Sequence, residues 1–299
     1  MAGAKVLVDI DGRSLSLSNL DKVLYPAAGF TKGEVIDYYA AVAGPLLAHL
    51  ADRPLTRKRW PDGVDGEAFF EKNRPRGTPD WVHTVHIAEH GDDGVTYVVA
   101  DDLPTLVWLA NLAAIELHVP QWTVGPRGGI RDPDLLVFDL DPGAPATVVE
   151  CCRVACWLRE RLAADGLTAW AKTSGSKGAQ LYVPLRRTPA TATSAYAKQL
   201  AEELSAAHQD LVVARMAKQE RGGKVFIDWS QNNAAKTTVA PYSLRGVQEP
   251  RVSTPLTWEE VAACRDAAEV AFGPAEVRSR LDQLGDLLAP MRTHAQHLP

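Results

Sequence analysis

The sequence predicts an α/β (α+β) protein in which helices alternate with strands and more than one sheet is present. Three segments of the Thr-x-x-Glu type, at Thr31, Thr147 and Thr257, carry the signature of a capped helix start. The apolar run at 135–138 is followed by Pro142-Gly143, which is typical of a buried strand that ends in a turn. Since no repeat or low-complexity linker divides the 299 residues, we expect a single domain.

Local patterns predict the individual elements. Residues 5–17 alternate like two strands around an Asp11-Gly12 turn, and an apolar-periodic helix runs from Thr31 to about Leu50, kinked or broken near Pro45. The other predicted helices cover about 102–117, 147–166, 193–208 and a tail from 257; the other predicted strands cover 82–99 (as a pair), 135–141, 167–173, 179–185 and 224–229.

Composition is that of an ordinary globular protein. Hydrophobic residues make up 46% of the chain and charged residues 23%, and no apolar run has the length of a membrane span. The first residues lack the apolar core of a signal peptide, so we expect a cytoplasmic protein. Cys151, Cys152, Cys156 and Cys264 have no zinc-ligand spacing and are predicted to be buried free thiols.

The net charge of −5 argues mildly against a nucleic-acid partner. Basic residues nevertheless cluster just before Trp60, where Arg53, Arg57, Lys58 and Arg59 stand close together. This run is either a solvated face or a basic patch for an acidic partner, and the sequence leaves both interpretations open.

Two segments carry carboxylates that could act together. Asp139 and Asp141 are two residues apart at the end of an apolar strand, and alternate residues of a strand point to the same face. Two adjacent carboxylates repel each other, and a cation relieves that repulsion; oxygen-only ligands favour Mg²⁺ or Mn²⁺. Asp228, on another predicted strand, would complete a two-metal site for phosphoryl or nucleotidyl transfer.

Other interpretations of the acidic pair exist. An isolated Asp-x-Asp is often a turn or capping feature. Phosphatases of the haloacid dehalogenase type also carry such a pair after an apolar strand, with the first Asp as nucleophile. They usually continue with Thr two residues later, where this chain has Gly143.

Several segments could bind phosphate. The run 174–178 (Ser-Gly-Ser-Lys-Gly) could turn backbone N–H groups toward an anion with Lys177 beside them, although a plain hairpin turn is the simpler interpretation. It lacks the Walker A spacing. Lys236 and Arg245 could clamp a polyphosphate or be surface cations, and His118, predicted at a helix end, is more often a core residue than a ligand.

Two further pairs are candidates for contacts with nucleic acid. Lys32 lies in the first turn of a predicted helix, where a cation is unfavourable unless an anion binds there, and Lys22 could join it. Solvated lysines are the alternative. Of Phe69 and Phe70, one could lie in the core and one could stack on a base, although burial of both is the simpler interpretation.

Together, these motifs resemble the polymerase domain of bacterial ATP-dependent DNA ligase D, in the archaeo-eukaryotic primase superfamily. The resemblance covers about 17–288 and rests on the segments Asp-Lys-Val-Leu-Tyr-Pro (21–26), Arg-Lys-Arg-Trp-Pro-Asp-Gly (57–63), Phe-Phe-Glu-Lys (69–72), Glu-Leu-His-Val-Pro-Gln-Trp (116–122), Phe-Asp-Leu-Asp-Pro-Gly (138–143), Thr-Ser-Gly-Ser-Lys-Gly (173–178), Lys-Val-Phe-Ile-Asp-Trp-Ser-Gln-Asn (224–232) and Ala-Pro-Tyr-Ser-Leu-Arg (240–245).

The resemblance implies a primase-like catalytic core with mixed, largely antiparallel sheets flanked by helices. Within one domain over 1–299, it implies an N-terminal DNA-end-binding part at about 1–130. A catalytic part similar to an RNA-recognition motif would follow at about 131–250, and a helical tail at about 251–299.

The resemblance also implies residue roles. Asp139, Asp141 and Asp228 would be catalytic and would hold two divalent ions, Mn²⁺ by preference or Mg²⁺. The nucleoside triphosphate would be bound by His118, Ser174, Lys177, Lys236 and Arg245. DNA would be bound by Lys22 and Lys32 at a 5′-phosphate, by Phe69 and Phe70 at the template, and by Arg221 and Lys224 near the 3′ terminus.

The implied activity is that of a DNA-dependent DNA/RNA polymerase that fills short gaps or extends broken ends of double-stranded DNA with a 5′-phosphate. It would use ribo- or deoxyribonucleoside triphosphates, with ribonucleotides often favoured, in bacterial end joining or excision repair. Expected partners are a separate ATP-dependent DNA ligase and Ku, with no membrane partner, and the expected location is the nucleoid in the cytoplasm.

Two departures qualify the resemblance. Many family members carry His where this chain has Gln180, and Gln cannot carry a proton or a positive charge. The Lys-x-Asp-Gly motif of DNA ligases is absent, so we expect either an excised domain or a stand-alone relative of the kind that works with bacterial ligase C. A non-catalytic module that binds DNA ends is the alternative function, although three retained carboxylates argue against it.

Overall fold

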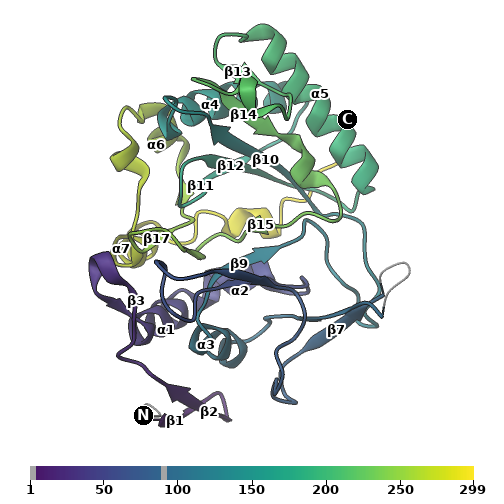
Figure 1. Ribbon diagram of the computed structural model, residues 1–299. Helices are drawn as coiled ribbons and strands as arrows, with labels where there is room; N and C mark the ends of the chain where they lie inside the picture. The colour runs from purple at the N-terminus through teal and green to yellow at the C-terminus, as the bar shows by residue number, and fades with distance from the viewer. Residues whose placement is uncertain (1–4, 89–92) are drawn as a thin grey trace.

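The computed structural model describes residues 5–88 and 93–299. Two sheets lie one above the other, and each has helices on its outer side (Figure 1). Strand β1 (Lys5–Ile10) lies below the lower sheet, and the chain ends beside the upper one. The site described below lies where the two sheets face each other.

The upper sheet has six strands in the order β13 (Val212–Val213), β14 (Val225–Asp228), β10 (Leu135–Pro142), β12 (Ala179–Pro184), β11 (Trp170–Thr173), β18 (Pro255–Leu256), and only β13 and β14 pair in parallel. Helices α4 (Val148–Ala164) and α5 (Ala190–Ala207) cover one face. Leu136, Phe138 and Leu140 pack in that helix-covered core. Because strand residues alternate, Asp139 and Asp141 belong to the opposite face.

The lower sheet has four antiparallel strands in the order β15 (Thr238–Val239), β9 (Ala114–Val119), β5 (Thr56–Arg59), β6 (Phe69–Glu71). Helices α1 (Lys32–Ala41), α2 (Ala43–Leu50) and α3 (Leu103–Asn111) pack with it in a second core, which includes Leu46, Leu106 and Leu117. β15 is far from β9 in sequence, so the chain returns from the upper sheet to complete the lower one.

The remaining elements surround these sheets. Four antiparallel strand pairs are β1 (Lys5–Ile10) with β2 (Arg13–Ser18), β3 (Val23–Tyr25) with β4 (Phe30–Thr31), β7 (Thr84–Ile87) with β8 (Val95–Val98), and β16 (Leu244–Arg245) with β17 (Arg251–Val252). Single 3₁₀ turns are η1 (Pro26–Ala28), η2 (Lys218–Glu220) and η3 (Trp229–Asn232).

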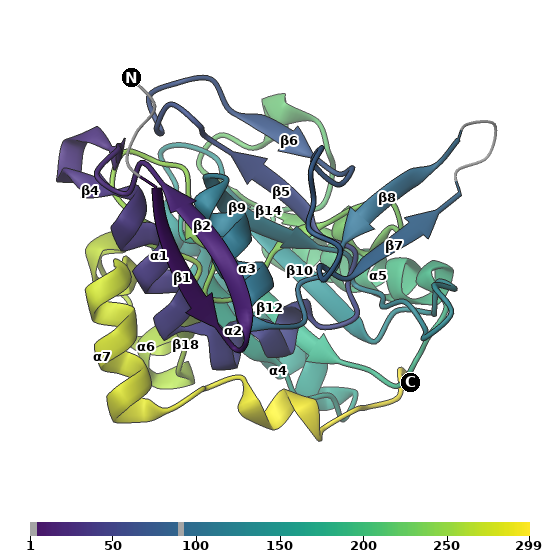
Figure 2. The same ribbon diagram turned by 90° about the horizontal axis from the view of Figure 1, so that it is seen from below.

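The C-terminal segment joins the two halves. It contains α6 (Trp258–Ala263), η4 (Ala267–Val270), α7 (Pro274–Leu284) and η5 (Ala289–Arg292), and Figure 2 shows α7 beside α1. Phe272 packs against both large cores, Val261 lies in the upper core and Val277 in the lower one. This contact pattern stabilises the position of one sheet relative to the other.

Much of the predicted architecture is confirmed. The fold is a mixed helix and sheet structure with largely antiparallel strands, the N-terminal hairpin forms, and capping boxes are present at Thr31, Thr147 and Thr257. All four cysteines are free thiols, and Cys151, Cys152 and Cys264 are buried. The loop expected between β7 and β8 falls partly outside the described residues. Within the described ranges, no helix has the length and apolarity needed to cross a membrane.

One local prediction is wrong, and the break expected near Pro45 is confirmed. The helix expected over 102–117 ends at Asn111, and 114–119 form β9 after a turn in which Ala113 has φ 57°. Residues 114–119 pair with both β5 and β15 and so form a central strand. Local sequence patterns do not reveal pairing with such distant segments. The long N-terminal helix breaks at Val42; Pro45 lies in the first turn of α2, where backbone N–H groups need no helical partner.

The side chain of Asn232 extends the pairing of β10. β14 pairs with β10 only over 139–142, and beyond it Asn232 accepts a hydrogen bond from the Val137 N–H (2.9 Å) and donates one to the Val137 carbonyl (2.7 Å). Asn232 is buried, so the two backbone groups of Val137 have no access to water in its place.

We therefore expect Asn232→Ala to lower the free energy of unfolding by about 2–4 kcal/mol, because two buried backbone groups lose their partners. Urea denaturation followed by circular dichroism measures this. Gln199→Ala, which removes an exposed hydrogen bond to Glu203 on α5, is the control and should change stability by less than about 0.5 kcal/mol. Equal effects of the two substitutions would contradict the stabilising role of the Asn232 hydrogen bonds to Val137.

Candidate functional site

The site is built around three carboxylates. Asp139 and Asp141 share one face of β10, and antiparallel pairing places Asp228 of β14 directly opposite Asp139. Side chains at such positions lie about 5 Å apart at Cβ. Burial is the main cause that raises the pKa of Asp139 to about 7. The charges of Asp141 and Asp228 also raise this pKa, whereas a hydrogen bond from Gln180 lowers it. Burial and the Asp228 carboxylate also raise the pKa of Asp141.

Neighbouring side chains orient two of these carboxylates. Gln180 Nε2 donates to Asp139 Oδ1 (2.9 Å) from the adjacent strand β12. Asp228 accepts hydrogen bonds from the Ser230 N–H (3.0 Å), the Ser230 hydroxyl (2.5 Å) and Gln231 Nε2 (3.0 Å). The side chain of Asp228 therefore also begins the 3₁₀ turn that follows β14.

The donor set fits a divalent cation by its chemistry. Within the described ranges, no three His, Cys, Asp or Glu side chains are already gathered closely enough to hold a metal ion. Asp139, Asp141 and Asp228 nevertheless supply only oxygen ligands, as Mg²⁺ and Mn²⁺ prefer. Burial raises the pKa values of Asp139 and Asp141, and the charges of neighbouring carboxylates raise them further; a cation would offset both effects.

A cavity of about 290 Å³ opens beside the carboxylates. Of the residues predicted for the site, it is lined by His118, Asp139, Asp141, Ser174, Lys177 and Arg245, together with Gln180. These residues come from both sheets, so the cavity exists only because the two halves pack against each other. Asp228 and Lys236 do not line it, although their neighbours Gln231 and Thr237 do, and Lys236 is exposed.

The run 174–178 is the turn of a hairpin between β11 and β12. The Ser174 hydroxyl accepts hydrogen bonds from the N–H groups of Ser176 (3.3 Å) and Gly178 (3.1 Å). Two of the backbone donors expected to receive an anion are therefore engaged within the loop itself. Lys177 is exposed at its tip and borders the cavity, so the positive charge of this lysine is the loop's clearest means of attracting an anion.

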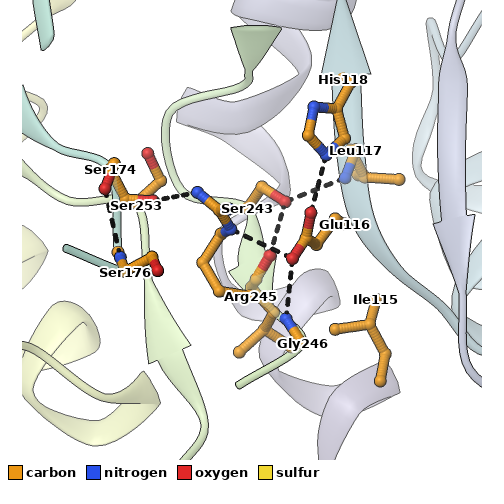
Figure 3. A network of polar contacts seen from close by, with 12 residues as sticks. Ile115, Glu116, Leu117, His118, Ser174, Ser176, Ser243, Arg245, Gly246 and Ser253 are labelled. Carbon is orange, nitrogen blue, oxygen red and sulfur yellow. Dashed lines mark hydrogen bonds and ion pairs between the residues drawn. The ribbon is translucent and has the colours of Figure 1, made fainter. Parts of the chain in front are cut away.

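The sequence predicted His118 at a helix end, but the structure places it in strand β9. Its Nε2 contacts Glu116 Oε2 at 2.8 Å, and the other Glu116 oxygen forms an ion pair with Arg245 Nε at 3.1 Å (Figure 3). Arg245 also donates to the Ser174 carbonyl, on the far side of the cavity. The sequence analysis missed Glu116; an acid two residues before a histidine on one strand face was the available signal.

Lys172 is a second residue that the sequence analysis missed. It is buried opposite Gln180 on β11, and its Nζ donates to the Ser253 hydroxyl (2.6 Å). Burial lowers the pKa of Lys172 well below its ordinary value, while the charge of Asp139 acts in the opposite direction. Lys172 therefore lies close enough for its charge to act on Asp139.

The phenylalanine pair is exposed on β6. Phe69 is 43% exposed and Phe70 61%, so the burial that was the simpler expectation does not occur. Lys58 lies over the Phe70 ring and Arg59 over the Phe69 ring. Phe70 also meets His118 edge-on with ring centroids 5.7 Å apart. An exposed aromatic surface thus continues directly into the wall of the cavity.

Most of the basic run before Trp60 has internal partners. Arg53 pairs with Asp134 (2.6 Å), and both Arg57 and Arg59 pair with Glu71 (3.1 Å). Arg57 is completely buried. The run is therefore neither a fully solvated face nor a free basic patch.

The remaining predicted DNA residues lie at two places. Lys22 forms an ion pair with exposed Asp62 (2.8 Å), whereas Lys32 is buried and donates to the Asn111 carbonyl (3.0 Å). Burial, followed by the nearby charge of Lys22, lowers the pKa of Lys32. On the opposite half, Arg221 lies over the Phe226 ring and Lys224 donates to the Gln209 carbonyl (2.6 Å).

A model of the LigD primase-polymerase domain matches residues 31–288 of this chain. The chain therefore belongs to the LigD primase-polymerase domain family, a family of nucleotidyltransferases. The polymerase domain of Mycobacterium tuberculosis ligase D, solved in complex with DNA, is 44% identical with a TM-score of 0.88; the match covers 94% of this chain and 99% of that one. The resemblance found in the sequence and the primase-like fold are thus confirmed.

Two longer relatives show the same relationship. The multifunctional non-homologous end joining protein LigD of Mycolicibacterium smegmatis is 46% identical over 281 residues, which cover 93% of this chain and 36% of the relative. The bifunctional non-homologous end joining protein LigD of Bacillus subtilis is 34% identical over 249 residues, which cover 83% of this chain and 39% of the relative. The chain thus spans little more than a third of either relative.

The raised pKa of Asp139 predicts a stability effect. We expect metal-free Asp139→Asn to be more stable than the wild type at pH 8 by on the order of 2–4 kcal/mol, since one pKa unit corresponds to about 1.4 kcal/mol. Below pH about 4 Asp139 is protonated whether the chain is folded or not, so the difference vanishes; it grows up to pH about 7 and is constant above.

Urea denaturation in EDTA between pH 4.5 and pH 8 measures this difference. Adding Mn²⁺ should raise the melting temperature of the wild type and have little effect on Asp139→Asn. A stability difference that does not change with pH would contradict the account of Asp139, and equal stabilisation of both proteins by Mn²⁺ would contradict the metal assignment.

Proposed function

We propose that this chain is a DNA-dependent polymerase that adds nucleotides to the 3′ end of a DNA strand at short gaps or broken ends. The observation that carries this proposal is the cavity between the sheets, which brings Asp139 and Asp141 together with Lys177 and Arg245. Carboxylates that can hold cations and basic side chains that can bind phosphates are the two components that nucleotidyl transfer requires.

Two divalent ions, Mn²⁺ or Mg²⁺, would be held by Asp139, Asp141 and Asp228. When bound, such ions activate the attacking 3′-hydroxyl and neutralise charge on the pyrophosphate leaving group. The chain's own side chains would provide position and charge: Arg245 can bind a phosphate group through two N–H donors, and Lys177 acts as a point charge. Lys236 and His118 complete the proposed nucleotide site, and no side-chain nucleophile is needed.

Gln180 has a definite place in this proposal. Its amide donates to Asp139 Oδ1, so it orients a metal ligand by a neutral hydrogen bond. An amide neither gains nor loses a proton over the working pH range, so this position adds no charge to the triphosphate site. We infer that the departure from the family's histidine changes how the triphosphate is neutralised and leaves the carboxylates in place.

The DNA would extend across both halves. We propose that Phe70, with Phe69, stacks on the template strand because both rings are exposed next to His118. Lys22 and Lys32 would bind the 5′-phosphate on the far side of a gap, and Arg221 and Lys224 would contact the primer end.

We further propose a biological setting. The protein would act at the nucleoid in the bacterial cytoplasm, in end joining or excision repair, with Ku and an ATP-dependent DNA ligase as partners. Ribo- and deoxyribonucleoside triphosphates would both be substrates, with ribonucleotides favoured. Similarity to the LigD proteins of end joining supports this setting.

Extension of a primer across a short gap in Mn²⁺ tests the activity. Asp139→Ala and Asp141→Ala should each lower incorporation at least about 10³-fold, because several kcal/mol of metal-dependent stabilisation is lost, while DNA affinity stays within about twofold. Asp228→Ala should be nearly as severe. Asp282→Ala, on the exposed side of α7, is the control.

Comparing ribo- with deoxynucleoside triphosphates in the same assay gives the sugar preference. Near-normal extension by the Asp139 or Asp141 variant would refute the site. DNA binding without any addition by the wild type would instead favour a non-catalytic end-binding module. Release of phosphate from monoesters would favour the phosphatase interpretation.

The phosphate contacts predict a dependence on salt and on the 5′ end. Lys22→Ala combined with Lys32→Ala should abolish the preference for a 5′-phosphorylated gap and reduce the slope of log affinity against log salt by about 1 per lost contact. Fluorescence anisotropy with matched 5′-phosphate and 5′-hydroxyl DNA measures both quantities. Lys198→Ala, an exposed lysine on α5, should leave them unchanged; an unchanged preference in the double variant would show that the phosphate binds elsewhere.

A further inference from the structure

Glu116 is a buried carboxylate that lies behind the cavity and not in its lining. It is 3% exposed, and both of its oxygens are engaged: Oε1 accepts from the Gly246 N–H (2.9 Å) and pairs with Arg245 Nε (3.1 Å), while Oε2 meets His118 Nε2 (2.8 Å). Burial alone would raise the pKa of Glu116, but the His118 hydrogen bond and the Arg245 charge outweigh it and lower the pKa to about 2. The carboxylate is therefore ionised despite its burial.

The two side chains that Glu116 holds both line the cavity with Asp139 and Asp141. Figure 3 shows them on either side of the carboxylate, with Arg245 reaching toward Ser174. His118 in turn touches Phe70 through its ring edge. Glu116 thus lies at the centre of a chain of contacts from the exposed aromatic surface of β6 to the hairpin turn that carries Lys177.

The backbone around Arg245 is fixed by other residues. The Ser243 hydroxyl accepts from the Leu117 N–H (3.0 Å), Tyr39 accepts from the Leu244 N–H (3.0 Å), and Tyr25 donates to the Arg245 carbonyl (2.9 Å). These bonds attach the segment to β9 and to the core without Glu116. Besides its bond to the Gly246 N–H, Glu116 adds the direction of the Arg245 and His118 side chains.

We propose that Glu116 is a positioning residue of the nucleotide site, which aligns Arg245 and His118 as one wall of the triphosphate pocket and connects that wall to the aromatic surface at Phe70. This inference rests on the proposed polymerase function. A guanidinium has five N–H donors, so the contacts with Glu116 and Ser174 leave donors for a phosphate group. A freely rotating Arg245 side chain would lose conformational entropy each time it bound the nucleotide. The ion pair with Glu116 restricts the side chain beforehand and so reduces this cost.

Glu116→Gln is the variant of choice because it changes little besides charge. The amide oxygen can still accept from the Gly246 N–H, and the amide nitrogen can still bond to a neutral His118. Only the ion pair with Arg245 is lost. The matched control is Glu260→Gln, since Glu260 also pairs with an arginine, Arg280, but lies on α6 away from the cavity.

Steady-state primer extension and direct titration of the nucleotide with Mn²⁺ by calorimetry should both respond. For Glu116→Gln we expect kcat/KM to fall about 10- to 100-fold, mostly through KM, with a parallel rise in the nucleotide Kd and DNA affinity within about twofold of the wild type. Glu116→Asp, which keeps the charge at a shorter reach, should recover part of the loss. Glu260→Gln should affect the melting temperature and leave KM unchanged.

A double variant separates positioning from general stability. If Glu116 acts through Arg245, adding Glu116→Gln to Arg245→Met should lower kcat/KM by no more than about threefold beyond Arg245→Met alone. Full multiplication of the two single effects would overturn the proposal, as would Glu116→Gln with a wild-type KM. If the wild type neither binds nor incorporates nucleotides, the proposed function itself fails and this inference fails with it.

Discussion

The repulsion between Asp139 and Asp228 is the constraint on which the rest of the site depends. Backbone hydrogen bonds between β10 and β14 fix the two carboxylates opposite each other, and Asp141 follows on the same face of β10. Such an arrangement is unfavourable without a cation, and burial makes it more so. The strand pairing and the apolar core under α4 and α5 supply the free energy that holds these charges together.

The second sheet turns this acidic strand end into a pocket. β9 and β15 carry His118 and Thr238 across from the carboxylates, and Arg245 reaches from the segment after β15 to Ser174. Neither half alone contains all the residues proposed to bind the metal ions and the phosphates. Because the C-terminal segment packs on both cores, the relative position of the sheets, and with it the shape of the pocket, is part of the folded state.

How much of the fold and of the site could be predicted from the sequence depends on whether the interactions join residues that are near or far apart along the chain. The same-face relation of Asp139 and Asp141 is local and follows from strand periodicity, and the capping boxes are equally local. The placement of His118 on a strand, and the role of Glu116 beside it, depend on pairing with β5 and β15 from distant parts of the chain. The basic run before Trp60 was ambiguous because its partners Glu71 and Asp134 are not neighbours in sequence. The grouping of Asp228 with the other two acids was a hypothesis from the strand pattern, and the family resemblance implied the same grouping.

Close contacts of backbone with backbone surround the tip of β10. A Cβ atom at Gly178 would lie 2.1 Å from the Leu140 carbonyl oxygen, and one at Gly143 would lie 1.9 Å from the Arg221 carbonyl oxygen. Neither glycine supplies a side chain for chemistry, yet any larger residue would push a neighbouring segment away from Asp141. In a library scored only by activity, both positions would therefore appear as intolerant as the three carboxylates proposed to bind the metal ions. A measurement of folded protein in the same library would separate the two kinds of intolerance.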